Sequence, residues 1–370
     1  MKNRWQHRNI GDLCEVIAGQ SPEGKSYNTD GKGMPFYQGK KNFEEKFIGD
    51  PTTWTTQVTK IARKGDILMS VRAPVGPVNF VTDEICIGRG LAAIRSKAEL
   101  NRDFLFYQLL YLQPEIAGKE GAVFASINKS EIAALSIAFA PFPEQQRIVG
   151  ILDEAFEGIA IAKTNAKKNL QNARALFKSH LQSVFTQRGK GWQTKHLGDL
   201  CDVLDNKRKP ITKRDRIAGK YPYYGATGVL DHVQGYLFDE PLVLVGEDGA
   251  KWESGENTAF AVEGKCWVNN HAHVLRPDRT KLLDNWLIYH LNHSDLIEFV
   301  SGLTVPKLNQ GTLREIPIPL PPIPEQQRIV KKIDSLREKT QRLESLYQQK
   351  LTALEALKKS LLYQAFKGAL

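Results

Sequence analysis

The sequence predicts two pseudo-symmetric globular α+β domains separated by a long two-helix antiparallel coiled coil. The string PEQQRIV occurs twice, at Pro143–Val149 and Pro324–Val330, which is 181 positions apart (324 − 143). A stretch of about 44 residues begins at each copy and contains no proline after its first residue, and a mixed segment of short strands, turns and a few helices precedes each copy. A chain that repeats one framework at half its length is a fused pseudo-dimer.

The repeat extends well beyond the seven residues. Near the start of each half, Ile10–Ile17 aligns with Leu197–Leu204. The segments between these matches, roughly 20–85 and 206–265, hardly align. A shared frame with divergent inserts indicates the same task performed on two different targets.

Size and charge restrict the class of protein. A length of 370 residues allows two globular domains plus extra helix. The net charge of +10 favours a polyanion partner, the alternative being a basic protein without one. The N-terminal residues do not resemble a signal peptide and no stretch is apolar over the length of a membrane span, so a cytoplasmic setting is expected.

The four cysteines, Cys14, Cys86, Cys201 and Cys266, do not form CxxC pairs. In the repeat, Cys14 aligns with Cys201 and Cys86 aligns with Cys266. We expect small buried hydrophobic side chains at equivalent core positions, with a disulfide or a metal site as the alternative.

Prolines predict where the long helices begin. Proline suits the first turn of a helix, and the acidic residues that follow, Glu144 and Glu325, suit its positive end. Pro143 and Pro324 should therefore mark helix starts. The predicted divisions are a first domain at 1–142, a central helix at 143–189, a second domain at 190–323 and a C-terminal helix at 324–370.

Apolar spacing predicts that the two helices pack on each other. In the second helix the spacing alternates between three and four residues, as in a coiled coil, over Ile329, Ile333, Leu336, Thr340, Leu343, Tyr347, Lys350, Leu354, Leu357 and Leu361. The aligned positions of the first helix are Ile148, Leu152, Ala155, Ile159, Ala162, Ala166, Asn169, Ala173, Leu176 and His180. If the two helices pack antiparallel, the alanines of the first helix could leave room for the leucines of the second. The alternative is two independent surface helices, but a helix of roughly 65 Å needs a partner.

The order and duplication of these segments resemble the specificity (S) subunit of type I restriction-modification enzymes. The most specific pieces are the two PEQQRIV strings and Lys307-Leu308-Asn309 before Ile316-Pro317-Ile318-Pro319. Val245–Ala250 and Asn270–Leu275 also look like patterns of this family. The resemblance covers essentially the whole chain.

This resemblance implies a fold, partners and a task. Each variable domain would be a target recognition domain for one half of a bipartite site in double-stranded DNA. The helices would form a spacer and dock two methyltransferase (M) subunits, which motor-nuclease (R) subunits join. The S subunit would perform no catalysis and hold no cofactor, with S-adenosylmethionine expected on the M subunit, and no membrane would be involved. One departure is that Gly88-Arg89-Gly90 stands where the second half has Asn269-Asn270-His271.

Polar and basic side chains in the variable segments are the candidate DNA contacts, because they bind base edges and phosphates. In the first domain they are Lys40, Lys41, Asn42, Arg63, Arg72 and Arg89. In the second they are Asn206, Lys207, Arg208, Lys209, Lys213, Arg214, Tyr223, Tyr224, Lys251, Asn270 and His271, of which Lys207–Lys209 is the expected phosphate clamp. A solvated surface charge is the alternative for each. Lys129, Lys307 and Asn309 could instead cap or brace the junction between domain and helix.

Motifs for catalysis are missing from the sequence. It contains no Asn/Asp-Pro-Pro-aromatic loop and no P-loop, and three ExK triplets are weak evidence for a nuclease. His271 and His273 could bind a metal near Cys266, but a base contact or a hydrogen-bonded core histidine is favoured. Two other hypotheses stay open: an enzyme that acts alone on DNA, and a scaffold whose domains bind no DNA.

Overall fold

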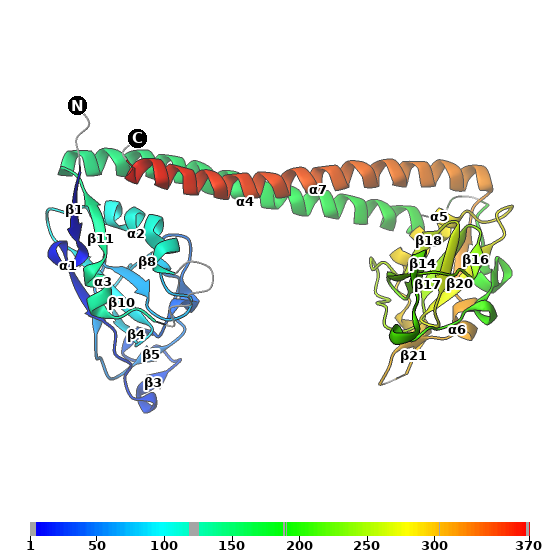
Figure 1. Ribbon diagram of the computed structural model, residues 1–370, viewed down its shortest axis with the longest axis horizontal. Helices are drawn as coiled ribbons and strands as arrows, with labels where there is room; N and C mark the ends of the chain where they lie inside the picture. The colour runs from blue at the N-terminus through cyan, green and yellow to red at the C-terminus, as the bar shows by residue number, and fades with distance from the viewer. Residues whose placement is uncertain (1–4, 118–125, 188, 190, 303, 368–369) are drawn as a thin grey trace. The chain divides into compact units, whose positions relative to one another are not determined.

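The computed structural model describes residues 5–117, 126–187, 189, 191–302, 304–367 and 370. Residue 188, in the predicted central helix, and residue 190, in the predicted second domain, lie outside this range. The chain divides into two compact units: unit 1 is 1–166 with 349–370, and unit 2 is 167–348. Each unit combines a β-rich domain with parts of two long helices, α4 (Phe142–Thr186) and α7 (Ile323–Phe366) (Figure 1).

Among its described residues, the domain of unit 1 contains two larger sheets, a two-stranded ribbon and three α-helices that precede α4. Its main sheet is antiparallel, in the order β2 (Cys14–Ala18), β10 (Leu91–Ser96), β7 (Ile67–Ser70) and β8 (Val78–Phe80). The second sheet has the order β3 (Tyr27–Asn28), β5 (Trp54–Thr55), β4 (Met34–Tyr37), β9 (Ile85–Ile87) and β6 (Ile61–Ala62). A two-stranded ribbon pairs β1 (Gln6–Asn9) with β11 (Ser136–Phe139). The helices are α1 (Ile10–Leu13), α2 (Arg102–Ile116) and α3 (Lys129–Ala134).

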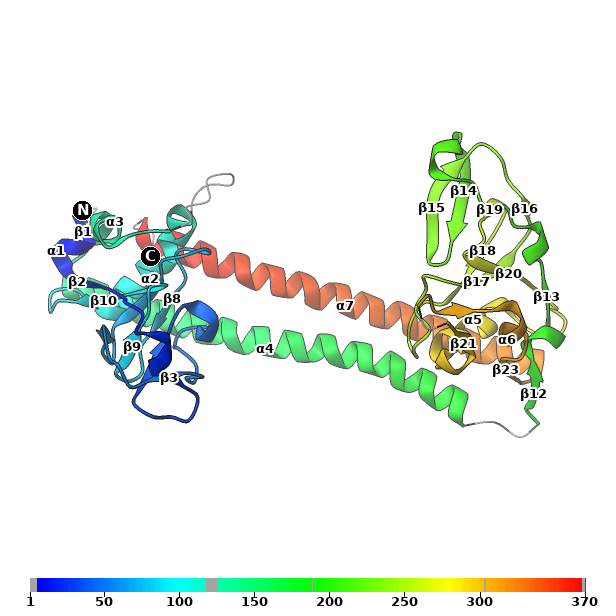
Figure 2. The same cartoon turned by 90° about the horizontal axis from the view of Figure 1, so that it is seen from below.

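The domain of unit 2 repeats this plan. Its main sheet has the order β13 (Cys201–Val203), β20 (Ala272–Pro277), β17 (Leu242–Gly246) and β18 (Ala259–Val262). The second sheet has the order β15 (Gly228–Val233), β14 (Ala218–Gly225), β19 (Lys265–Val268) and β16 (Phe238–Asp239), with β14 and β15 forming a long hairpin (Figure 2). Two ribbons pair β12 (Gln193–His196) with β23 (Pro317–Leu320) and β21 (Val300–Ser301) with β22 (Lys307–Leu308). The helices are α5 (Asp284–His293) and α6 (Gln310–Arg314).

All four cysteines are buried and free, as predicted for small core side chains. Cys14 and Cys201 begin equivalent strands, and Cys86 and Cys266 lie in the second sheets. Burial raises the pKa of Cys14 and Cys201 to about 12, so these thiols stay protonated near neutral pH.

The long helices begin one residue before the prolines that were expected to mark their starts, at Phe142 and Ile323. They are antiparallel within each unit. In unit 1, Arg147 of α4 donates to the Leu370 carbonyl, and Lys163 pairs with Glu355 at 2.6 Å. In unit 2, Arg174 pairs with Glu344 at 2.9 Å. Among the described residues, no helix is apolar over a length sufficient to cross a membrane.

The predicted contact stripe of the second helix is correct over Ile329, Ile333, Leu336 and Thr340, and beyond Thr340 alternate positions are displaced by one residue. Of the predicted positions, Leu343 and Leu357 are 38% and 46% exposed, whereas Leu351 and Lys358 are partly buried. The first helix shows the same displacement, with Leu176 exposed and Phe177 partly buried. A strict 3.5-residue repeat drifts by about 20° per heptad against a helix of 3.6 residues per turn. Over four heptads that drift moves the contact to the neighbouring side chain.

Candidate nucleic-acid interface

A polar pocket of about 530 Å³ lies on the variable part of unit 1. It brings together three of the predicted contacts, Lys41 and Asn42 of the short 3₁₀ helix η2 (Lys40–Asn42) and Arg89 from the turn between β9 and β10. Two aromatic rings also line it, Tyr27 and Phe36, which stack with centroids 4.8 Å apart. A pocket with cationic side chains and aromatic rings can hold an anionic, planar ligand group.

The Gly88-Arg89-Gly90 turn needs glycine at position 90, because that residue lies directly on the backbone at the end of β4. A Cβ atom at Gly88 would lie 2.7 Å from Gln38 Oε1, and one at Gly90 would lie 2.4 Å from the Gln38 carbonyl oxygen. The backbone therefore approaches closer than any side chain would permit. The turn is further fixed by Ser21, whose hydroxyl accepts from the Arg89 amide and donates to Gln38 Oε1. The exposed Arg89 side chain is thus carried on a fixed backbone.

The other predicted contacts of the first domain are not gathered in this pocket's lining. Lys40 is exposed in η2. Arg63, at 65% side-chain exposure, lies 3.8 Å from Glu84, and Arg72 is exposed where its backbone bridges to Ser126. Asn42 has a structural bond as well, since its Nδ2 donates to the Asp50 carbonyl.

In unit 2 two segments of predicted contacts lie against each other. The 3₁₀ helix η4 (Asp205–Lys207) and the residues after it meet the turn between β19 and β20, where Lys209 N donates to the Val268 carbonyl. The side chains of Asn206, Lys207 and Lys209 in the first segment are exposed, as are those of Asn270 and His271 in the second. His271 also pairs with Asp248. Both segments therefore carry exposed basic or polar side chains.

Three predicted contacts are exposed outside these two segments. Lys213 and Arg214 belong to another 3₁₀ helix, η5 (Lys213–Asp215), where Arg214 is 88% exposed beside Asp215. Lys251, 73% exposed, lies 3.4 Å from Glu256. Their side chains are exposed, so a polyanion can reach them.

Arg208 does not have the predicted role in a phosphate clamp. Its side chain is 13% exposed, and its guanidinium pairs with Glu247 and, at 3.3 Å, with Asp205. It also donates to the Ala272 carbonyl at 2.8 Å. A buried guanidinium that already has two carboxylates cannot also bind a DNA phosphate without breaking these pairs.

Tyr223 is likewise unavailable as a surface contact. Its ring is 1% exposed, and the guanidinium of Arg216 lies over it at 4.4 Å. Its hydroxyl accepts from the Ile211 amide at 3.0 Å, which holds the loop before β14. Tyr224 is partly buried and its ring lies 5.9 Å from that of Phe260. The alternation of side chains along β14 turns Tyr223 into the core.

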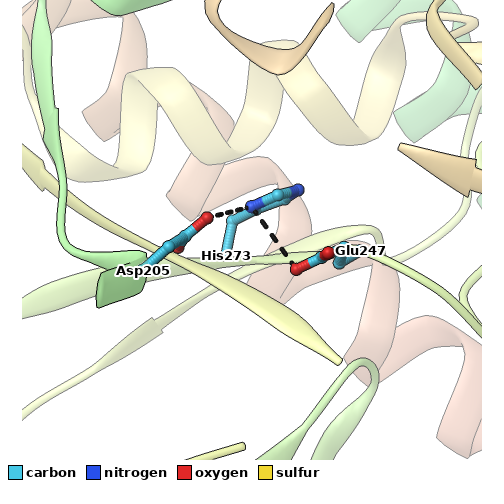
Figure 3. A group of neighbouring side chains, drawn as sticks. All are labelled: Asp205, Glu247 and His273. Carbon is cyan, nitrogen blue, oxygen red and sulfur yellow. Dashed lines mark hydrogen bonds and ion pairs between the residues drawn. The ribbon is translucent and has the colours of Figure 1, made fainter. Parts of the chain in front are cut away.

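Arg208 belongs to a buried ionic cluster with Asp205, Glu247 and His273 at its centre (Figure 3). His273 Nδ1 lies 2.6 Å from Asp205 Oδ2, and Lys307 Nζ lies 2.6 Å from Glu247 Oε1. Burial alone would raise the pKa of both carboxyls, but hydrogen bonds from His273 and the Val274 amide to Asp205, and from Lys307 and Arg208 to Glu247, outweigh it and hold both pKa values below their ordinary range. The cluster thus joins η4, the end of β17, β20 and β22.

The same cluster has donor atoms spaced as in a metal site, all within 4.8 Å of one another. Its charges are already balanced, because Arg208 and Lys307 neutralise the two carboxylates. His273 Nε2 is also engaged, at 2.7 Å from the Leu308 carbonyl. The arrangement agrees with the expectation of a hydrogen-bonded core histidine rather than a ligand pairing of His271 and His273.

Of the residues expected to brace the domain–helix junction, Lys307 and Asn309 bond to residues of their own domain. Lys307 pairs with Glu247, as above, and Asn309 Nδ2 donates to Ser301. In unit 1, Asn128 caps α3 in a capping box with Glu131, while the adjacent Lys129 is exposed. Sequence reasoning missed Gln38 and Ser21 in the pocket of unit 1, although the glycines on both sides of Arg89 signal a close backbone approach.

The fold and these surfaces define a tandem protein: two copies of one α+β framework, each with its own basic loops and each built on the same pair of helices. The chain belongs to the family described as "Type I restriction modification DNA specificity domain", which matches residues 2–172 and again residues 189–353. The family resemblance inferred from the repeated strings is therefore confirmed.

Relatives with assigned names agree. A putative type I restriction enzyme MjaX specificity subunit from Methanocaldococcus jannaschii is 40% identical over 174 residues, covering 46% of this chain and 40% of the relative. The putative specificity subunit S.HindORF215P from Haemophilus influenzae is 37% identical over 40% of this chain and 38% of its own length. The match thus spans less than half of either relative. The EcoDI specificity subunit from Escherichia coli is 33% identical over 99% of this chain and 88% of its own length.

Solved structures share the fold over the whole chain. One, from work on complex assembly and conformational transition of the type I R-M system, has a TM-score of 0.80 at 20% identity and covers 100% of this chain and 99% of its own. The HsdS subunit from Thermoanaerobacter tengcongensis has a TM-score of 0.62 at 18% identity, covering 100% and 98%. The predicted fold, two α+β domains with a long antiparallel helix pair, is confirmed.

Proposed function

We propose that this chain is the DNA-specificity subunit of a type I restriction-modification enzyme and binds a bipartite target in double-stranded DNA. The observation that carries the proposal is the duplication itself, since one family framework occurs twice with different exposed loops in the two copies. Equal frameworks with unequal loops suit two half-sites of different sequence. The net charge of +10 suits a phosphate backbone.

Each unit supplies the chemistry that DNA recognition requires. Unit 1 presents Lys41 and Arg89 at a pocket, and an arginine on a fixed backbone can bind the O6 and N7 atoms of guanine. Unit 2 presents Lys207 and Lys209 as well as Asn270, a combination of phosphate-binding cations with an amide that can bind adenine.

The finer part of the proposal concerns partners. Two M subunits dock on the α4–α7 helices, R subunits join them, and the chemistry takes place on the partners, with S-adenosylmethionine bound by M. The sequence supports this division of labour because it lacks the methyltransferase and P-loop motifs. One structural neighbour comes from work on the assembly of a type I complex. A cytoplasmic setting stays a prediction.

Mapping of methylated bases by single-molecule sequencing tests the proposal. Cells that express the chain with its M partner should methylate one bipartite motif with a constant gap, and cells without the chain should lose that motif. Replacing residues 1–142 by those of a relative should change one half-site only. A motif that persists without the chain would contradict the proposal.

Binding by the purified chain provides a second test. Several phosphate contacts should make log affinity for duplex DNA fall steeply with log salt concentration, and addition of M should increase both affinity and specificity. A scaffold that binds no DNA would show no such dependence. Methylation of plasmid by the chain alone with S-adenosylmethionine would indicate an enzyme instead.

A further inference from the structure

The two glutamines of the repeated PEQQRIV string differ sharply in burial. Gln145 and Gln326 are 0% exposed, whereas the next residues, Gln146 and Gln327, are exposed. A buried primary amide needs partners for its oxygen and its two N–H groups. Both buried amides have them, and the partners are equivalent in the two units.

In unit 1, Gln145 joins three parts of the molecule at the start of α4. Its Oε1 accepts from the amide of Asn101, which caps α2, at 2.7 Å. Its Nε2 donates to the carbonyl of Ala140, just after β11, at 2.8 Å and to the carbonyl of Glu99 at 3.2 Å. The side chain thus ties the long helix to the domain's last strand and to the start of α2.

In unit 2, Gln326 makes the same three bonds at the start of α7. Its Oε1 accepts from the amide of Leu283, the cap residue of α5, at 2.9 Å. Its Nε2 donates to the carbonyls of Pro321, just after β23, and Lys281, each at 2.8 Å. All of these partners are backbone groups, so the bonds are independent of which side chains the two domains carry.

A second bond joins the same helices further along. Tyr107 of α2 donates to Asp153 of α4 at 2.5 Å, and Tyr289 of α5 donates to Asp334 of α7 at 2.5 Å. Both tyrosines are buried. Each aspartate lies eight residues after its glutamine, about 12 Å along the helix. Two attachments at separate points fix the direction of a helix as well as its position.

We propose that Gln145 and Gln326 are positioning residues that set the angle between each domain and its long helix and, given the proposed function, thereby set the gap between the two half-sites. The tyrosine–aspartate pairs complete the two joints. Because α7 is 44 residues long, its length is about 66 Å. A tilt of about 3° at one end moves the other end by roughly 3.4 Å, the rise of one base pair.

The chain contains its own matched control for this proposal. Gln326→Met removes the buried amide while keeping an unbranched side chain of similar size, and Gln327→Met makes the same change at the exposed neighbour. Tyr289→Phe is a milder variant that removes only the hydroxyl group. It replaces Gln326→Met in the experiments below if circular dichroism shows that Gln326→Met does not fold.

Spin-label distances test the joint without DNA. Labels on Glu263→Cys, in the turn between β18 and β19, and Gln341→Cys, on α7, both lie on exposed residues of unit 2, and the native cysteines are buried. Gln326→Met and Tyr289→Phe should broaden the distance distribution measured by pulsed electron resonance, and Gln327→Met should leave it unchanged. Distributions as narrow as that of the unmodified protein in both joint variants would overturn the proposal.

Methylation mapping tests the consequence for the gap. With Gln326→Met the half-site sequences should persist, while discrimination against gaps one base pair longer or shorter falls about tenfold, as expected for loss of a few hydrogen bonds. Broadened distances with an unchanged gap would overturn the link to spacing. If the unmodified chain directs no bipartite motif, the proposed function fails and the spacing link falls with it, while the label distances still decide the joint.

Discussion

The two units have the same joints to the long helices but different interiors beneath their loops. Cys14 pairs with Ser96 and Cys201 pairs with Pro277, so Ala92 and His273, each four residues earlier on its strand, occupy one structural position. Val71 and Glu247 correspond in the same way, because the amides of Ile127 and Leu308 donate to their carbonyls. Unit 1 fills these positions with apolar side chains, and unit 2 fills them with an ionic cluster.

This difference shows which bonds the framework requires. The bonds that are identical in both units involve backbone groups, a buried glutamine and a tyrosine–aspartate pair. Side chains packed against the variable loops are free to change chemistry, provided that every buried charge keeps a partner. Five predictions test this distinction.

The largest effect should come from breaking the ionic cluster. Glu247→Ala leaves the buried Arg208 with Asp205 as its remaining carboxylate and removes the partner of the partly exposed Lys307, and it should destabilise unit 2 by about 3 kcal/mol. The equivalent Val71→Ala in unit 1 removes only apolar surface and should cost about 1–2 kcal/mol. Urea titration followed by hydrogen exchange of peptides from each unit measures both. Equal losses would contradict the comparison.

Acid should unfold unit 2 before unit 1. The pKa values of Asp205 and Glu247 are lowered in the folded state, so their contribution is present above the unfolded-state values near 4 and is lost as pH falls through the folded-state values. Unit 1 has apolar residues in place of Glu247 and His273. Hydrogen exchange of both units from pH 6 to pH 2, corrected for intrinsic rates, provides the measurement. Loss of hydrogen-exchange protection at the same pH in both units would contradict the prediction that these carboxylates make unit 2 more sensitive to acid.

Substitutions at the loops should separate base recognition from phosphate binding. Arg89→Ala should weaken discrimination at one half-site by about 1–3 kcal/mol and leave the other unchanged. Lys207→Ala should weaken binding to all sequences and reduce the slope of log affinity against log salt by about one. Titration of labelled duplexes at several salt concentrations distinguishes the two. A loss of discrimination at both half-sites on Arg89→Ala would show that the units are not independent.

The joints should respond alike in the two units. Tyr107→Phe and Tyr289→Phe each remove one buried hydrogen bond to a carboxylate and should each cost about 1–2 kcal/mol. Tyr363→Phe, at a residue 57% exposed, is the control and should have little effect. The same unfolding titration measures all three. A loss confined to one unit would mean that the joints are not equivalent.

The smallest effect should occur on the helix stripe. Leu357 is 46% exposed, so Leu357→Ala should change stability by less than about 0.5 kcal/mol. Leu351, partly buried in the same unit, should lose more when changed to Ala. A larger loss of stability from Leu357→Ala than from Leu351→Ala would instead support the strict heptad pattern that the sequence suggested.

The sequence predicts the framework better than the surfaces. The repeated string locates both helix starts to within one residue, because the prolines and acidic residues act locally. Nothing local distinguishes Gln145 from Gln146, since burial depends on where β11 and α2 place their backbone groups. Similarly, Lys207 and Arg208 are neighbours with like charge, but Arg208 pairs with Glu247, which is distant in sequence, whereas Lys207 stays exposed. Contacts between residues that are far apart in the sequence cannot be seen in a local sequence pattern.

The way the long helices are divided between the units has a consequence for biosynthesis. Leu362, Ala365 and Phe366 of α7 belong to the hydrophobic core of unit 1, where the Phe366 ring lies 5.4 Å from that of Phe104. A ribosome makes Phe104 long before Phe366. The part of the protein translated first therefore completes its core last, after unit 2 has been made, and a nascent chain that stalls before residue 362 leaves an apolar surface for chaperones to cover.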